Sequence, residues 1–248
     1  MSSAQMVGCL WGTDRTANER GGQVNMVKIN GMHKKVYDIS ILLGTEQVDP
    51  PIPGVAPFSL KPVFSIKDGG ACHLSNLSLN CHTGTHIDAP AHFIADSNTI
   101  DGYPVERFIV PAQVVDINDQ VMIRREDLES LGIEKGEALL FKTNNSKGGI
   151  SRSSELQNDW VYLSAEAADV CVEKGVSLIG IDYIAPEQPG GSIEHAPIHE
   201  KLLKNDILIL ESIALDAVPA GKYTLFCLPL KIKGAEASPV RAILMKWA

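Results

Sequence analysis

The stretch His82-Thr-Gly-Thr-His86-Ile-Asp88-Ala-Pro-Ala-His92 holds three of the chain's seven histidines and one aspartate within eleven residues. Its proline and β-branched residues disfavour a helix, so we expect extended chain. In an ideal strand, His82 and His86 would share one face at a separation of about 13 Å, which is too long for both to bind one ion. A bend at Gly84 would close that gap and bring both to Asp88. Because imidazole and carboxylate groups bind borderline divalent cations, the stretch predicts a metal site rather than three ordinary polar histidines.

In the rest of the chain, runs typical of strands outnumber helical ones, and the few helical runs all lie after residue 124. Helical character is confined to residues 125–132, 165–175 and 196–206, and the second of these follows Ser164, a good N-cap, and stops at Gly175. Runs typical of strands occupy 36–44, 63–66, 74–80, 112–117, 138–143, 176–182, 207–212, 223–230 and 240–247. The pattern predicts a mixed α/β fold around a β-rich core.

The two ends of the chain differ in character. Residues 1–34 are polar, rich in glycine and asparagine, and without periodicity, so we expect a loosely ordered N-terminal extension. The remaining residues, 35–248, contain no internal repeat and no low-complexity tract, and they are expected to form one domain.

Charge and cysteine content exclude several classes of function. Twenty-two basic against thirty acidic residues give a net charge of −8 without a basic stripe, so neither nucleic acid nor an anionic membrane is expected as a partner. Five cysteines without CxxC spacing indicate reduced thiols rather than a disulfide framework. No apolar run is long enough for a membrane span, and the N-terminus lacks the features of a secretory signal. A cytoplasmic location is therefore expected.

The motif at residues 82–92 resembles the HxGTHxDxPxH signature of the cyclase-family metal-dependent hydrolases, which include kynurenine formamidases (arylformamidases) and isatin hydrolases. Four further segments look familial: VYDIS from residue 36, PPIPG at 50–54, GID at 180–182 and LPLKIKGAEASPVRAIL at 228–244. The resemblance covers the chain from about residue 36 to its end. It implies a swivelling β/β/α fold with a β-barrel-like core, assembled as a homodimer or homotetramer.

The resemblance also implies a centre of one or two Zn²⁺ or Mn²⁺ ions per subunit. In formamidases of the family, two ions, usually zinc, are held at positions that match His82, His86, Asp88, His199 and Glu211. The isatin-hydrolase branch uses one manganese ion on the first three of these ligands. The last histidine of the motif, His92, matches the general acid/base of the family.

The residues themselves say less about the two later ligands. Glu211 ends the apolar run ILIL, where a carboxylate is costly unless it is paired or coordinated, although a glutamate at the edge of a strand is common. His195 lies one helical turn before His199, so the residues alone leave both as candidate ligands. The twelve-residue spacing to Glu211 in the family pattern favours His199.

The activity that the resemblance implies is hydrolysis of N-formylkynurenine to kynurenine and formate, a step of tryptophan catabolism. Formamidases of the family commonly carry a tryptophan that stacks on the substrate, and Ile52 stands at that position here. Phe58 and Phe64 are candidates for a replacement aromatic wall, so with Ile52 they form the predicted substrate pocket. Two alternatives remain open: a hydrolase of lactams or lactones, as in the isatin-hydrolase branch, and a non-catalytic protein that binds metal or ligand.

Overall fold

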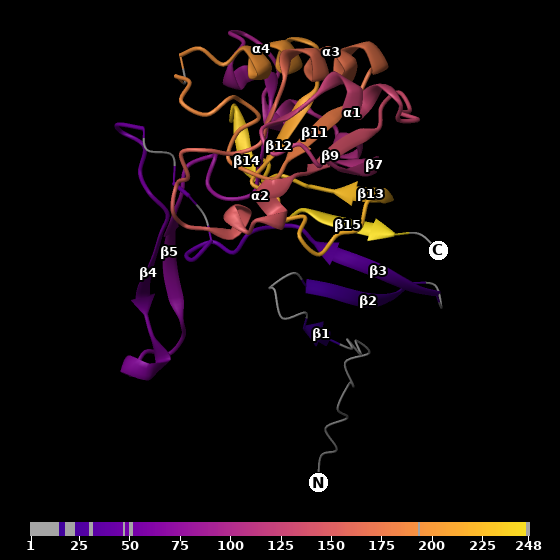
Figure 1. Ribbon diagram of the computed structural model, residues 1–248. Coiled ribbons are helices and arrows are strands. Elements are labelled where there is room, and N and C mark those ends of the chain that lie inside the picture. The colour runs from indigo at the N-terminus through magenta and orange to yellow at the C-terminus, as the bar shows by residue number, and fades with distance from the viewer. Residues whose placement is uncertain are drawn as a thin grey trace.

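The computed structural model describes residues 15–17, 23–29, 32–46, 48–49, 52–192 and 194–246. Its centre is an eleven-stranded sheet in the order β1-β2-β3-β15-β13-β7-β9-β11-β12-β6-β14 (Figure 1). These strands are β1 (Arg15–Ala17), β2 (Gln23–Ile29), β3 (Met32–Asp38), β6 (His86–Asp88), β7 (Ile109–Asp116), β9 (Ala138–Lys142), β11 (Leu178–Ile181), β12 (Leu208–Glu211), β13 (Gly221–Phe226), β14 (Ala237–Pro239) and β15 (Ile243–Lys246).

Shorter elements surround this sheet. Two small sheets pair β8 (Met122–Ile123) with β10 (Tyr162–Leu163) and β4 (Ser59–Phe64) with β5 (Leu74–Ser78). The helices are α1 (Arg125–Glu129), α2 (Asn144–Lys147), α3 (Ala165–Lys174) and α4 (Pro197–Lys204), with short 3₁₀ helices η1 (Ile66–Asp68), η2 (Pro90–His92), η3 (Ile100–Gly102), η4 (Val105–Phe108) and η5 (Ile150–Arg152). Within the described part of the chain, no helix has the length and apolar character needed to span a membrane.

The middle of the large sheet is parallel and buried on both faces. Strands β7, β9, β11 and β12 run parallel, and β6 then pairs antiparallel with β12. Leu139 and Phe141 of β9 pack with α1, α3 and α4, which cover one face (Figure 1), whereas Ala138 and Leu140 join the core on the other face. Double-sided burial explains why these strands are continuous apolar runs instead of alternating ones. The predicted mixed α/β fold around a β-rich core is confirmed.

The N-terminal region differs from the expected loose extension. Residues 23–29 form β2, which pairs antiparallel with β3, and residues 15–17 form β1 on its outer side. The signal for this hairpin is the sequence Asn30-Gly31 between two β-capable runs, because Asn-Gly favours two-residue hairpin connections. The part of the expected extension at residues 1–14 lies outside the described residues.

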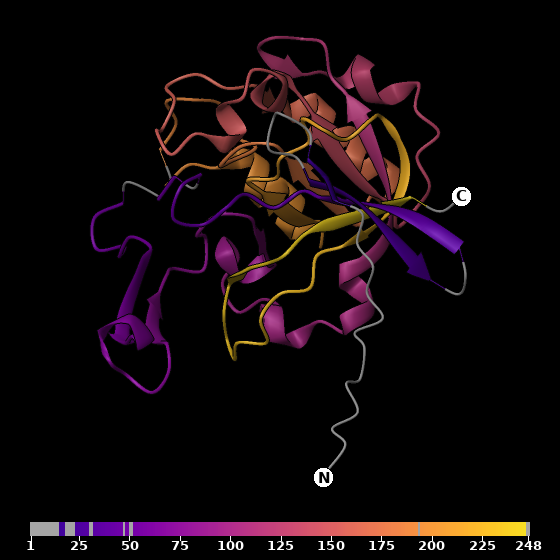
Figure 2. The same ribbon diagram turned by 90° about the horizontal axis from the view of Figure 1, so that it is seen from below.

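The hairpin of β4 and β5 projects from the body of the molecule in both ribbon views (Figures 1 and 2). Every residue of β5 is exposed, and so are five of the six residues of β4. We refer to residues 59–78 as the arm. After the arm, the chain enters the turn that carries His82. The arm therefore directly precedes the histidine-rich stretch in the sequence, but its exposed strands are not part of the core.

The GID segment has a structural role at the end of β11. The carboxylate of Asp182 is fully buried and accepts hydrogen bonds from the backbone N–H groups of Thr143 and Ser146, from the Thr143 hydroxyl and from the Asn145 amide. Asp182 thereby fixes the start of α2 against β11. All of its contacts are donors of the protein itself, so this buried aspartate is satisfied without a ligand.

Candidate metal centre

Four elements bring the predicted ligands together. His86 and Asp88 are the two ends of β6, and β6 lies between β12 and β14. The antiparallel register with β12 places Glu211 directly opposite His86. His199 comes from α4, and His82 comes from the turn before β6. The large sheet and one helix therefore converge on a site whose residues lie up to 129 positions apart, between His82 and Glu211.

The bend expected at Gly84 is present. Gly84 has a φ of +67°, in the left-handed region, and the ring centroids of His82 and His86 lie 5.0 Å apart. A straight strand would separate them by about 13 Å. A side chain at position 84 would also meet Leu43, whose Cδ2 lies 2.3 Å from the ideal Cβ position. The left-handed backbone conformation is what favours glycine here, whereas the atom that an added side chain would meet is the movable end of Leu43.

Gly84→Ala is expected to cost somewhat more stability than a left-handed alanine alone, because the end of the Leu43 side chain must turn away from the added methyl group. It is also expected to weaken metal binding, because the strained left-handed residue lies in the turn that carries His82. The matched control is Gly190→Ala, whose φ is +80° with no atom within 4 Å of the added Cβ. The control should lose about 1–2 kcal/mol of unfolding free energy and bind metal normally. Denaturant unfolding and competition with a chelator measure both quantities. Equal losses and unchanged metal affinity in the two variants would show that the turn accepts alanine at position 84 and that glycine is not needed to place His82.

Asp88 is the centre of the cluster. Its Oδ1 lies 3.1 Å from His82 Nδ1 and 3.5 Å from His86 Nε2, and its Oδ2 lies 3.8 Å from His199 Nε2. Glu211 closes the other side, with Oε2 3.1 Å from His86 Nε2 and Oε1 3.0 Å from His199 Nε2. Asp88, His86, His199 and Glu211 are all buried, with at most 5 % of the residue exposed.

The hydrogen bonding of this cluster is incomplete in a way that suits a cation. Both carboxylate oxygens of Asp88 and Nε2 of His86 are buried without a hydrogen bond, although oppositely charged atoms lie close by. Their lone pairs are therefore not aligned with donors. Two overlapping sets have ligand atoms within 4.8 Å of one another: His82, Asp88 and His92, and His86, Asp88 and Glu211. These nitrogen and carboxylate donors fit one or two divalent ions, with Asp88 common to both sets.

The charges of the cluster depend on one another. Burial would lower the pKa of His86, but Asp88 and Glu211 outweigh it and raise the pKa to about 9. Burial is likewise outweighed at His199, where Glu187 and Glu211 raise the pKa to about 10. Burial would raise the pKa of Asp88, but the neighbouring imidazoles hold it below its ordinary value. Without a cation, the protein thus balances two buried carboxylates with protonated imidazoles.

His92 differs from the other histidines of the cluster. It lies at the end of η2 with its ring centroid 4.2 Å from that of His82 and 5.8 Å from that of His199. Burial and these two imidazoles outweigh the attraction to Asp88 and lower the pKa of His92 to about 4. His92 is therefore neutral at pH 7 and able to accept a proton beside the ligand groups.

The structure separates two histidines that the residue pattern left as alternatives. His199 faces Asp88 and Glu211, whereas His195 is exposed just before α4. It also shows neighbours that the sequence did not suggest. The ring of Phe93 lies 4.9 Å from that of His199 and 4.4 Å from that of His92. Its only signal in the sequence is its place directly after the motif.

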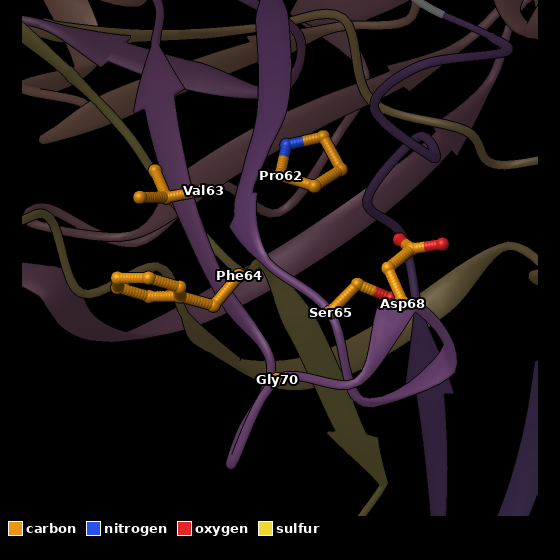
Figure 3. A pocket seen from close by; sticks show the side chains of 6 residues that line it. All are labelled: Pro62, Val63, Phe64, Ser65, Asp68 and Gly70. Atoms are coloured by element: carbon orange, nitrogen blue, oxygen red, sulfur yellow. The ribbon is translucent and has the colours of Figure 1, made fainter.

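The three predicted pocket residues differ in how far they are buried. Ile52 and Phe58 are half-buried, and Phe58 packs near Gly44. Phe64 is exposed on the arm, where it lines a surface pocket of about 230 Å³ with Pro62, Val63, Ser65, Asp68 and Gly70 (Figure 3). The arm that carries Phe64 projects from the body of the molecule in both ribbon views (Figures 1 and 2).

Comparison with known proteins gives consistent results. The sequence model of the putative cyclase family matches residues 37–188. A kynurenine formamidase of Bacillus cereus is 35% identical over 77% of this chain and 89% of its own length, and one of Salinibacter ruber is 37% identical over 72% and 82%. Among solved structures, isatin hydrolase A of Ralstonia solanacearum has a TM-score of 0.76 at 26% identity, covering 86% of this chain and 92% of its own. A potential metal-dependent hydrolase with cyclase activity has a TM-score of 0.70 at 28% identity, covering 87% and 99%.

Proposed function

This chain belongs to the cyclase family, and from that premise we propose that it is a metal-dependent hydrolase of small amides that converts N-formylkynurenine to kynurenine and formate. One observation carries the proposal. The carboxylate of Asp88 is fully buried among His82, His86 and His199, yet it accepts no hydrogen bond. A buried carboxylate in that state is costly unless it binds a cation. Asp182 provides the contrast: it is a buried aspartate outside the cluster, and its carboxylate accepts hydrogen bonds from the protein itself.

The residues that would hold the metal are His82, His86, Asp88, His199 and Glu211, as one or two ions of Zn²⁺ or Mn²⁺. When bound, a divalent ion supplies Lewis acidity toward a carbonyl oxygen and lowers the pKa of water. Asp88 and Glu211 offset the positive charge of the centre and lie within 4 Å of the imidazole nitrogens that complete it. Phe93 packs against His199 and limits the space around that ring.

His92 would handle the proton of the reaction. Being neutral at pH 7, it accepts a proton from the attacking water as the water oxygen bonds to the formyl carbon. It then donates that proton to the arylamine nitrogen as the C–N bond breaks. Formate and the free amine leave, and His92 returns to its neutral form. One residue thus serves first as base and then as acid.

Metal binding to this site is expected to release close to two protons at neutral pH. The metal-free protein holds His86 and His199 protonated, with pKa values of about 9 and about 10, and a metal ligand must be a neutral imidazole. Apparent affinity for Zn²⁺ should therefore rise by up to about 100-fold per pH unit between pH 6.5 and 8.5. Titration calorimetry in buffers of different ionisation enthalpy counts the protons. An affinity that is independent of pH in this range would contradict the assignment of these two residues.

A lactam is the second candidate substrate class. The structural likeness to isatin hydrolase A spans 86% of this chain, and Ile52 stands where an aromatic stacking residue is expected for a formamidase. In ring opening of a lactam, His92 would protonate an amine that stays attached to the product. The proton path is the same, so the metal centre serves either substrate and the surrounding walls decide between them.

Assembly and location are part of the same proposal. We expect a homodimer or homotetramer that acts on a small molecule in the cytoplasm. The four cysteines within the described residues, Cys72, Cys81, Cys171 and Cys227, are free thiols, which suits a reducing compartment. Sedimentation analysis of the purified protein measures the size of the assembly.

The deciding assay uses protein stripped of metal, with Zn²⁺ or Mn²⁺ added back, and N-formyl-L-kynurenine and isatin as parallel substrates. Metal-dependent release of kynurenine supports the formamidase proposal and shows that Ile52 can stand in place of the aromatic residue. Turnover of isatin alone moves the protein to the lactam branch. Metal binding without turnover of either substrate would overturn both assignments and favour a binding protein.

A further inference from the structure

Each of the three predicted ligand histidines, His82, His86 and His199, has a second ring nitrogen that contacts a group other than Asp88. In His86 that nitrogen, Nδ1, lies 2.8 Å from the carbonyl oxygen of Gly84. In His82 it is Nε2, 3.4 Å from a carboxylate oxygen of Glu236, whose side chain is 40% exposed. In His199 it is Nδ1, 3.1 Å from Oε1 of Glu187. The side chain of Glu187 is only 16% exposed, so His199 has the more shielded charged partner of the two.

Glu187 also begins the helix that carries His199. Its Oε1 accepts the backbone N–H groups of Ile198 and His199, both at 2.8 Å. The residue at the N-cap of α4 is Ala196, which has no side-chain acceptor, and Pro197 follows it. The first free N–H groups of α4 are therefore satisfied by a carboxylate from outside the helix, where negative charge is favourable.

The loop that presents Glu187 is held by hydrogen bonds to two of its carbonyl oxygens. The carbonyl oxygen of Pro186 accepts the N–H of Leu163 at 2.9 Å, and the carbonyl oxygen of Glu187 accepts the indole N–H of Trp160 at 2.9 Å. The Trp160 ring in turn lies 5.3 Å from that of Tyr183. The backbone at Glu187 is thus held by groups outside α4, while its carboxylate contacts the start of the helix.

A carboxylate can only accept, so the contact with Glu187 requires the proton of a neutral His199 to be on Nδ1. The lone pair is then on Nε2, which lies 3.0 Å from Glu211 and 3.8 Å from Asp88. One oxygen of Glu187 therefore fixes the place of the helix start, the rotation of the ring and the choice of tautomer. Outer partners of this kind orient ligand histidines and increase their basicity.

We propose that Glu187 is a positioning residue of the metal centre, which holds His199 with Nε2 directed at the cation site while it caps α4. The inference rests on the proposed metal centre but not on the identity of the substrate. It gives a function to Glu187, the first residue of the segment EQPGGSIEHAP, which the motif at residues 82–92 leaves unexplained.

The test compares Glu187→Ala, Glu187→Gln and Ser164→Ala in the full-length protein. Ser164 is the matched control, because its hydroxyl accepts the N–H of Ala167 and caps α3, away from the cluster. The readouts are Zn²⁺ affinity by competition with a chelator, the visible absorption spectrum with Co²⁺, and the melting temperature of the metal-free protein. None of them depends on turnover.

Ser164→Ala and Glu187→Ala should each lower the melting temperature by about 2–4 °C, as expected for a lost cap. Only Glu187→Ala should also weaken Zn²⁺ binding, by about 10- to 100-fold, and change the Co²⁺ spectrum. Glu187→Gln keeps an acceptor but loses the charge, so it should recover most of the melting temperature and weaken binding by roughly 3- to 10-fold.

Wild-type Zn²⁺ affinity in Glu187→Ala would reduce Glu187 to a helix cap and overturn the inference. If Glu187→Ala does not fold, wild-type affinity in Glu187→Gln overturns it equally. A wild-type protein that binds no metal would overturn both the inference and the proposed function. If the wild type binds metal but hydrolyses neither substrate, and Glu187→Ala still shows the loss of Zn²⁺ affinity, the inference is supported and only the proposed function is contradicted.

Discussion

Replacing His92 by alanine is expected to lower kcat by about 10²- to 10⁴-fold while the protein keeps its full metal content. The reason is the separation of tasks within the cluster. His92 lies beside His82 with its pKa lowered to about 4, so at pH 7 it is a neutral base, whereas the buried His86 and His199 contact carboxylates directly. Without His92, no group of the cluster is free to move a proton from water to the departing nitrogen.

The measurement pairs steady-state kinetics with metal content by atomic emission. His195→Ala is the control, because His195 is exposed before α4 and outside the cluster. It should leave kcat within about twofold, as expected for a surface substitution outside the cluster. Loss of metal along with activity would make His92 a ligand, as its place with His82 and Asp88 permits. Unchanged turnover would remove His92 from the mechanism.

Replacing Asp88 by alanine is expected to abolish stoichiometric metal binding and, with it, turnover. Asp88 is common to both candidate ligand sets, so its loss removes a donor from each. Zn²⁺ affinity should fall by more than about 100-fold, beyond the loss typical of an outer partner. The metal-free protein should also lose about 3–5 kcal/mol of unfolding free energy, because protonated His86 would be left buried with one carboxylate fewer.

Asp182→Ala serves as the control for burial. Asp182 is also a fully buried aspartate, but its four donors belong to Thr143, Asn145 and Ser146. This variant should lose stability by a similar amount and still bind metal when folded. If Asp88→Ala bound Zn²⁺ with wild-type affinity, the cluster would not be the metal centre. Chelator competition and denaturant unfolding on both variants provide the comparison.

Individual helices and strands could be predicted from the sequence where a segment contains its own capping residues or apolar run. Helix α3 spans residues 165–174 as expected, because the Ser164 hydroxyl accepts the N–H of Ala167 and Gly175 ends the helix in the left-handed conformation. Strand β12 lies within the predicted apolar run 207–212. The hairpin of β2 and β3 was not predicted, because residues 1–34 were assigned from their polar composition and lack of periodicity and not from the Asn-Gly pair at residues 30 and 31.

The order of the strands in the sheet does not follow from such local signals. Apolar periodicity tells which face of a strand is buried, but it does not tell which strand lies beside it. Nothing in the run 207–212 indicates that β12 sits between β11 and β6, or that Glu211 lies opposite His86. The pairing of β12 with β6 joins Ile209 to Asp88, which are 121 positions apart in the sequence.

The sequence by itself determined the part of the site that is local: three histidines and an aspartate within eleven residues, and a glycine where the chain must bend. Only the tertiary structure decided that His199 and not His195 completes the cluster, and that Glu187 holds it there. The physical reason is the range of the interactions. Spacing and backbone preference act within a few residues, whereas the position of α4 over β12 and β6 is set by packing of the whole sheet.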